Sequence, residues 1–298
     1  MPFEKIIGNE KIKELLTKTI NSNTVVNAYM FLGKAGIGKM LFAKEFAQSI
    51  LCQGKGSKPC NKCKSCMEFI GNSNPDISII EPDGNSIKIE QIRMLNSKIM
   101  EKPVTSNKKV YIINDSEKMT VEAQNCLLKT LEEPPVYATI ILICCNETKM
   151  LTTIKSRCTK ITFASISNKD LKQYINDVDD SIISFADGSL GKLLQIKDKQ
   201  ELYSNIEKII NSLENMPKSK VWNSCDIIYK SQDEINEILD YMNILFLNKG
   251  KAEEKYLNCI EIVEKAKRRL LSNSNFNMTI DNLLISIWEE INEKYSRS

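Results

Sequence analysis

A phosphate-binding loop is the feature that most restricts how this chain of 298 residues can fold. Gly33, Gly38 and Lys39 fit the Walker A pattern G-x-x-x-x-G-K-[ST], and Gly36 lies inside the same loop. The apolar run before the loop predicts a buried strand, and the apolar run after it predicts a helix. This order would place backbone N–H groups and the positive end of a helix around a phosphate, with Lys39 reaching the outer phosphates.

The loop departs from the pattern where it should bind magnesium. Met40 occupies the position of the Ser or Thr whose hydroxyl is a Mg²⁺ ligand, and a thioether does not replace a hard oxygen ligand. A phosphate-loop enzyme also needs an acidic pair after a buried strand. Asn114 and Asp115 stand there, or Asp115 and Ser116 one residue further on. We therefore expect weak or absent ATP binding and very poor hydrolysis.

The first half of the chain alternates strand-like and helical patterns. Alternation of this kind predicts a parallel sheet with helices on both faces. The expected strands are Ala28–Leu32, Ile77–Glu81, Val110–Asn114, Thr139–Cys145 and Lys160–Phe163, and the expected helices are Leu41–Leu51, Ile89–Lys102 and Val121–Glu132.

The second half of the chain shows only helical periodicity and polar loops. A helix N-cap is indicated at Ser167, because an acidic residue, Asp170, follows three positions later. Asp187–Ser189 should interrupt two helices, and Asn215–Pro217 should form a linker to a last helical segment.

Composition excludes several classes of function. The net charge of +3 does not by itself indicate a nucleic-acid binder. No apolar run reaches the length of a membrane span, and the start of the chain lacks a signal-peptide pattern, so we expect a cytoplasmic protein without membrane contact. The chain contains no histidine, which rules out histidine-based acid–base catalysis and histidine metal ligands.

Four of the ten cysteines form a cluster with the spacing of a metal site. Cys60, Cys63 and Cys66 make two interlocking C-x-x-C steps, and Cys52 lies eight positions upstream. Four thiolates at such spacing favour tetrahedral Zn²⁺, and a site with four protein ligands is structural rather than catalytic. An iron–sulfur cluster and a redox C-x-x-C pair are the poorer alternatives.

Further motifs resemble one protein family. The segment Leu127–Pro135 (LLKTLEEPP) resembles the signature helix end of bacterial clamp-loader ATPases, and Ser156–Cys158 resembles their S-R-C motif. The start Phe3–Asn9 and the cysteine insertion at 52–66 are also similar. The family is the AAA+ clamp loader of the bacterial DNA polymerase III holoenzyme, and the resemblance covers roughly the first two hundred residues.

The resemblance implies three parts in the chain. An α/β AAA+ domain with a phosphate loop and a parallel five-stranded sheet is expected at 1–165, with the zinc module at 52–66 inside it. An all-α lid is expected at 166–212 and an all-α collar for oligomerisation at 213–298.

The same resemblance implies a division of labour between subunits. The gamma/tau motor subunits keep a complete nucleotide site and a lid arginine, whereas Gly191 stands at that arginine's position here. Loss of the chain's own site with retention of S-R-C resembles the delta prime branch of the family. Arg157 would then act in trans, as an arginine finger in the ATP site of a neighbouring subunit.

The implied partners are gamma/tau and delta subunits in a hetero-pentamer, the sliding clamp, and primed DNA through the assembled complex. The chain would hydrolyse no ATP itself, although it would belong to a nucleotidyltransferase holoenzyme. Two alternatives stay open: an ATP-hydrolysing gamma/tau-like motor or other AAA+ ATPase, and a zinc-dependent nucleic-acid-binding module centred on the cysteines.

Overall fold

The computed structural model describes residues 2–175, 180–272 and 274–292. The chain divides into two compact units. The first consists of Met1–Tyr174 with Gly188–Gly191, and the second of Ile175–Asp187 with Lys192–Ser298.

The first unit is built on a sheet of five parallel strands in the order β2-β3-β4-β1-β5. The expectation of a parallel five-stranded sheet is confirmed, and each strand boundary lies within one residue of its predicted place. The strands are β1 (Ala28–Leu32), β2 (Ile77–Ile80), β3 (Lys109–Ile113), β4 (Ala138–Cys144) and β5 (Thr159–Thr162). Because β1, β3 and β4 are flanked by other strands and covered on both faces, every residue in them is buried.

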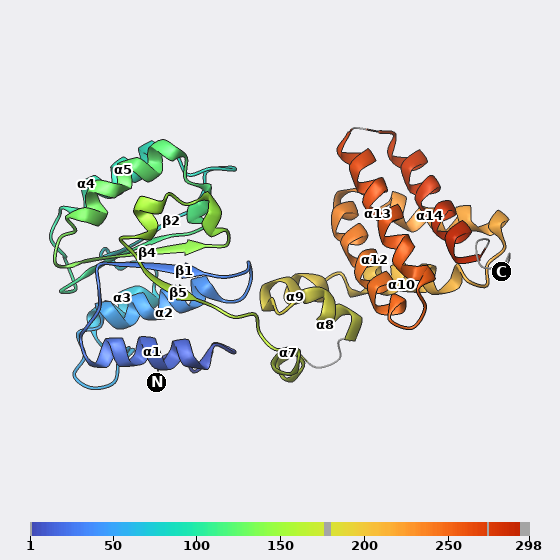
Figure 1. Cartoon of the computed structure of the whole chain (residues 1–298). Coiled ribbons are helices and arrows are strands. Elements are labelled where there is room, and N and C mark those ends of the chain that lie inside the picture. The colour runs from blue at the N-terminus through green and yellow to red at the C-terminus, as the bar shows by residue number, and fades with distance from the viewer. Residues whose placement is uncertain (1, 176–179, 273, 293–298) are drawn as a thin grey trace. The chain divides into compact units, whose positions relative to one another are not determined.

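Helices cover both faces of this sheet (Figure 1). On one face lie α1 (Glu10–Asn21), α2 (Lys39–Leu51) and α3 (Lys64–Ile70); on the other lie α4 (Ile89–Ile99) and α5 (Val121–Glu132). Short helices follow the later strands: η1 (Ser116–Lys118), η2 (Glu147–Lys149), α6 (Thr152–Lys155) and α7 (Asn168–Tyr174).

Two predicted helix ends needed correction. The structure ends α4 at Ile99 rather than Lys102. Pro103 explains part of the difference, because the residue before a proline is disfavoured in helical conformation. The structure begins α2 at Lys39 rather than Leu41, because the phosphate loop runs directly into the helix through Gly38.

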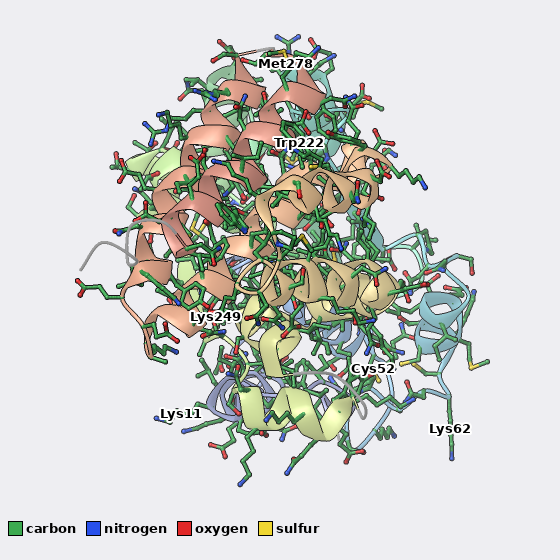
Figure 2. The ribbon with its side chains drawn as sticks, turned by 90° about the vertical axis from the view of Figure 1, so that its right-hand side faces the viewer. Lys11, Cys52, Lys62, Trp222, Lys249 and Met278 are labelled. Carbon is green, nitrogen blue, oxygen red and sulfur yellow. The ribbon has the colours of Figure 1, made fainter. Side chains whose placement is uncertain are left out.

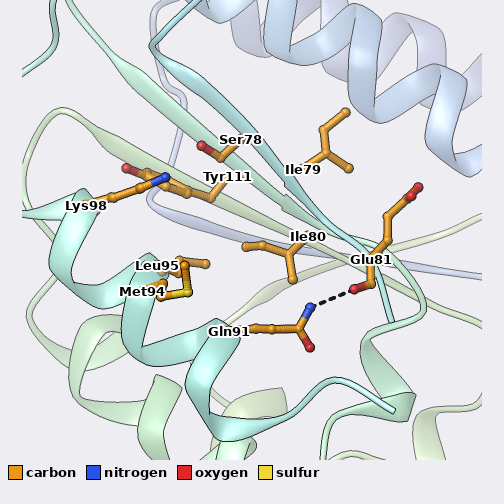
Figure 3. A pocket seen from close by; sticks show the side chains of 9 residues that line it. All are labelled: Ser78, Ile79, Ile80, Glu81, Gln91, Met94, Leu95, Lys98 and Tyr111. Atoms are coloured by element: carbon orange, nitrogen blue, oxygen red, sulfur yellow. Dashed lines mark hydrogen bonds between the residues drawn. The ribbon is translucent and has the colours of Figure 1, made fainter. Parts of the chain in front are cut away.

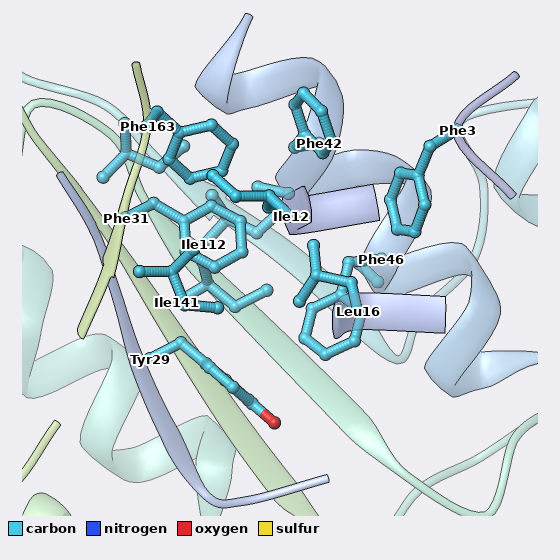
Figure 4. Close-up of a cluster of buried hydrophobic side chains, with 14 of the residues drawn as sticks. Phe3, Ile12, Leu16, Tyr29, Phe31, Phe42, Phe46, Ile112, Ile141 and Phe163 are labelled. Carbon is cyan, nitrogen blue, oxygen red and sulfur yellow. The ribbon is translucent and has the colours of Figure 1, made fainter. Parts of the chain in front are cut away.

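The two faces of the sheet carry separate apolar cores. Alternate residues of β1 point to opposite faces, so Tyr29 and Phe31 belong to the core under α1 and α2, whereas Met30 belongs to the core under α4 and α5. Aromatic rings cluster in the first core (Figure 4), where the Phe163 ring lies 5.0 Å from Phe42 and 5.1 Å from Phe31 between centroids. Full burial of each such side chain contributes about 1.5–3 kcal/mol.

From residue 164 onward, the described part of the chain contains helices and no strand. The second unit includes α8 (Asp180–Ala186), α10 (Gln200–Ser212), η3 (Lys218–Ser224), α11 (Cys225–Tyr229), η4 (Gln232–Glu234), α12 (Ile235–Gly250), α13 (Lys255–Leu271) and α14 (Phe276–Asn292), and α9 (Leu190–Lys197) begins in the first unit. Helices α12, α13 and α14 pack against one another in chain order. None of the described helices is long and apolar enough to cross a membrane.

The predicted interruptions in the helical half are present. The amide of Asp170 donates to Ser167 Oγ at 3.1 Å, as expected of an N-cap. The break at Asp187–Ser189 separates α8 from α9, and Asn215–Pro217 lies in the loop between α10 and η3. The division of this half into a lid at 166–212 and a collar at 213–298 stays a prediction.

Candidate functional site

The phosphate loop lies between β1 and α2, where its glycines permit a backbone that other residues would strain. Gly38 is the N-cap of α2 with φ of 93°. A Cβ on Gly33 would lie 2.7 Å from Ile37 Cδ1 and 2.9 Å from the Phe163 carbonyl oxygen. The loop therefore has the compact form that brings backbone N–H groups together at the start of a helix.

The Lys39 side chain is directed into this loop and is only 5% exposed. Its ammonium donates to the carbonyl oxygens of Gly33 and Lys34, each at 2.6 Å, and to Cys145 Sγ at 3.2 Å. These three contacts occupy the donors that a phosphate-loop lysine offers to a nucleotide. Phosphate binding would require Lys39 to leave them.

The segment Gly188–Gly191, which belongs to the first unit, contacts the phosphate loop. The Gly191 amide donates to the Gly36 carbonyl oxygen at 2.9 Å. A Cβ on Gly191 would lie 3.0 Å from Gly36 Cα and 3.3 Å from its oxygen, so a larger side chain would push these backbones apart. Gly191, which stands where an arginine was expected in an ATPase, thus permits the close approach of its own backbone to Gly36.

The residues at the positions where magnesium ligands were expected make other contacts within the chain. Met40 packs against the apolar core under α1 and α2. Asp115 accepts a 2.9 Å hydrogen bond from Lys118, which raises the pKa of that lysine. The Ser116 hydroxyl is buried and donates to the Ile143 carbonyl oxygen at 2.9 Å, so the alternative register also lacks a hydroxyl directed at a metal.

Sequence reasoning named Asp115 but missed two residues that lie beside it, Glu117 and Cys145. Ligand atoms of Asp115, Glu117 and Cys145 all lie within 4.8 Å of one another. One carboxylate oxygen of Glu117 is buried and has no hydrogen-bond partner in the part of the chain that the structure describes. The available signal was positional: these residues follow β3 and β4, whose carboxyl ends meet at one edge of the sheet.

The four predicted zinc ligands come together in space. The Sγ atoms of Cys52, Cys60, Cys63 and Cys66 all lie within 4.8 Å of one another. Cys52 follows the end of α2 and Cys66 belongs to α3, so the cluster joins two helices through the intervening loop. The exposed side chain of Lys62 extends away from this loop (Figure 2).

Backbone amides point at the cysteine sulfurs. Gly54 and Cys60 donate to Cys52 Sγ at 3.4 Å each, and Cys63 donates to Cys60 Sγ at 3.3 Å. Hydrogen bonds from the amides of Lys62 and Cys63 lower the pKa of Cys60 to about 6, whereas burial raises the pKa of Cys66. Amide donors of this kind stabilise thiolates, the form in which cysteine binds a metal.

The backbone at Gly54 passes close to the cysteine sulfurs. A Cβ on Gly54 would lie 2.6 Å from Cys60 Sγ and 3.4 Å from Cys52 Sγ, so only glycine fits there without displacing a ligand. The donor set and its surroundings fit a tetrahedral Zn²⁺ ion bound by four thiolates.

Arg157 lies at the surface just beyond α6. Its Nη1 donates to the Thr153 carbonyl oxygen at 2.9 Å, and its Nη2 forms an ion pair with Glu132 Oε1 at 2.6 Å. The next residue, Cys158, packs against the core under α4 and α5, and burial raises the pKa of its thiol to about 12. In the S-R-C segment, Cys158 therefore packs against the core and Arg157 lies at the surface.

A pocket of about 320 Å³ that the sequence did not indicate lies between the edge strand β2 and α4 (Figure 3). Gln91 crosses one end of it and donates to the Glu81 carbonyl oxygen at 2.9 Å. None of the predicted site residues lines this pocket.

Comparison with known proteins identifies the family. A family model described as "DNA polymerase III, delta subunit" matches residues 8–167, which is more than half of the chain. The chain belongs to this family. The delta′ subunit of DNA polymerase III from Bacillus subtilis is 26% identical over 315 residues, covering 94% of this chain and 96% of that protein.

Other similar proteins carry gamma-type names. The gamma/tau subunit of DNA polymerase III from Mycoplasma genitalium is 34% identical over 221 residues, covering 70% of this chain but only 37% of that protein. A solved structure from Thermotoga maritima, described as a DNA polymerase III gamma subunit-related protein, superposes with a TM-score of 0.53 at 18% identity. That superposition covers 93% of this chain and 99% of the other and shows a shared fold.

Proposed function

We propose that this member of the DNA polymerase III delta subunit family is a delta prime-type clamp-loader subunit. In this role it completes a neighbour's ATP site and helps to load the sliding clamp on primed DNA during replication. The similarity to the B. subtilis delta′ subunit along nearly the whole of both chains supports this assignment over a role limited to one module.

The observation that carries the proposal is the contrast between two cations. Lys39, which would hold the chain's own nucleotide, is buried and bonded to loop carbonyls, and Met40 beside it offers no hard ligand. Arg157 is 34% exposed at its side chain and stands outside that loop. The chain therefore has a degenerate ATP site of its own and an arginine accessible to another subunit.

Arg157 acts in trans on the neighbouring ATPase subunit. A planar guanidinium can donate two parallel hydrogen bonds to phosphate oxygens and offset the charge on a transferring γ-phosphoryl group. Arginine fingers of this type are worth on the order of 10³–10⁵ in rate. Arg157 is the only residue of this chain to which we assign a catalytic role.

Cys52, Cys60, Cys63 and Cys66 would hold a structural Zn²⁺ ion. The bound ion would supply a tetrahedral cross-link between the end of α2 and the start of α3 and would leave no open position for catalysis. The amide donors to sulfur and the close approach at Gly54 support this assignment.

The proposed assembly is a cytoplasmic hetero-pentamer with gamma/tau and delta subunits. Reconstitution tests it: the chain mixed with these subunits should form one complex whose ATP turnover and clamp loading on primed DNA depend on its presence. A complex that forms and turns over equally well without this chain would contradict the proposal.

A gamma/tau-like motor is the second candidate, favoured by the 34% identity to the M. genitalium protein and by the retained loop glycines and Lys39. Met40, Asn114 and Gly191 count against it. Turnover by the isolated chain distinguishes the two candidates, because only a motor would hydrolyse ATP alone.

A further inference from the structure

The Arg157 guanidinium already has an anionic partner within its own chain. Its Nη2 lies 2.6 Å from Glu132 Oε1, while its Nη1 donates to the Thr153 carbonyl oxygen. Glu132 is the last residue of α5, and Thr153 belongs to α6. One carboxylate and one carbonyl, from two different helices, therefore hold the two arms of the arginine fork.

The buried side-chain amide of Gln124 connects α5 to the segment that leads into α6. Gln124, on α5 and 2% exposed, donates to the Met119 and Lys149 carbonyl oxygens at 3.2 and 3.1 Å. Its own carbonyl oxygen accepts the Leu151 amide at 2.9 Å, immediately before α6 begins. These bonds tie α5 to the segment that leads into α6, and these two helices carry the groups that contact Arg157.

The ion pair itself is open to solvent. The side chains of Arg157 and Glu132 are 34% and 48% exposed. An exposed ion pair is weak and is screened by salt. A nucleoside triphosphate carries several negative charges, and its phosphate oxygens can accept hydrogen bonds from both arms of the Arg157 guanidinium. It can therefore displace a single carboxylate from the arginine.

We propose that Glu132 is a latch on Arg157: it holds the guanidinium within the chain and competes with the phosphate of a neighbouring subunit for it. The proposal rests on the trans role of Arg157 proposed above and adds the regulation of that same residue. Glu132 is not a catalytic residue in this account, because it acts only through the arginine.

The latch predicts that neutralising Glu132 makes the arginine more available. In the reconstituted complex, Glu132→Gln should raise kcat/KM for ATP at the neighbouring site about two- to five-fold, the range expected for loss of an exposed ion pair. The gain should shrink as salt is raised, because salt screens the pair in the parent protein. Because Glu132 is exposed, the thermal unfolding midpoint of the isolated chain should stay nearly unchanged.

Two matched variants make the result specific. Glu133→Gln removes the same charge from the adjacent exposed residue and should leave kcat/KM unchanged. Combining Glu132→Gln with Arg157→Ala should give the same rate as Arg157→Ala alone, because the latch has nothing left to hold.

The outcomes separate the latch from the arginine-finger role. If Arg157→Ala lowers turnover but Glu132→Gln matches Glu133→Gln, or lowers the rate, the latch is wrong and the finger stands. If Arg157→Ala leaves turnover normal, both are wrong. An equal gain from Glu132→Gln with and without Arg157 would also overturn the latch, since its effect would not pass through the arginine.

Discussion

Lys39 and Arg157 are both cations, but they differ in burial and in hydrogen-bond partners. Lys39 is buried and bonded to carbonyl oxygens of its own loop, whereas Arg157 lies at the surface, held by one exposed carboxylate and one carbonyl. The cost of releasing each cation therefore differs. In the proposed function, a nucleotide would have to break several partly buried hydrogen bonds to recruit Lys39 but only exposed ones to recruit Arg157.

The isolated chain should not hydrolyse ATP at a useful rate. Met40 provides no magnesium ligand and Asp115 is paired with Lys118, so neither the metal nor the attacking water is organised. A turnover assay with Mg²⁺ checks this, with Lys39→Ala as the control. Turnover at the level of an ordinary motor subunit that disappears in Lys39→Ala would show that the site is intact; weak binding without turnover agrees with the account.

Replacing one zinc ligand should abolish metal binding and destabilise the fold. The parent protein, purified without chelator, should contain about one zinc per chain, and Cys63→Ser should contain almost none and unfold at lower temperature. Acid should also release the metal, because protons compete for the thiolates. The matched control is Cys145→Ser, an exposed thiol outside the cluster that should keep its zinc. Parent protein free of metal would refute the site.

Sequence predicted those site residues that a local pattern defines. The loop glycines, Lys39, the cysteines and Arg157 all belong to short motifs with fixed spacing. The contacts of Glu132, Gly191 and Glu117 were not predictable, because they arise only in the tertiary fold. Contacts such as Gly191 with Gly36, which are 155 residues apart in sequence, have no signature in either local segment.

At the scale of elements, the buried strands were the easiest to predict and the short helices the hardest. Runs such as Thr139–Cys145 are almost wholly apolar and rich in β-branched residues, so the pattern clearly favours a buried strand. The sequence analysis did not identify α1, α3 or α6. Helix α6 has only four residues, too few for a periodic signal. Helix α3 directly follows the cysteine loop, and its seven residues are also too few for a clear period.

The connection between α5 and α6 offers a stability test at this scale. Gln124→Ala should destabilise the protein by about 1–3 kcal/mol, because one buried backbone group, at Met119, and two partly buried ones, at Lys149 and Leu151, lose their partner. Asn125→Ala, an exposed amide on the same helix, should change stability by less than about 0.5 kcal/mol. Chemical denaturation measures both. Equal effects of the two variants would mean that the Gln124 contacts do not hold these helices.

At the scale of the whole molecule, one unit carries the phosphate loop, the cysteine cluster and Arg157, and a second unit is made of helices. In the proposed function, the first unit keeps the phosphate loop but lacks the metal ligands that hydrolysis needs. In that function, the chain acts on ATP only within an assembly. Its activity should therefore be invisible in the isolated chain and present in the complex.

The most direct test of the central claim is Arg157→Ala in the complex reconstituted with gamma/tau and delta subunits, clamp and primed DNA. The variant should fold and assemble normally, because Arg157 is exposed, but ATP hydrolysis at the neighbouring site and clamp loading should fall by at least about 10³-fold if that site dominates turnover. Arg157→Lys should recover little, because a point charge does not reproduce the planar fork. Normal hydrolysis and loading by a complex carrying Arg157→Ala would contradict the account and leave this chain as a passive member of the ring.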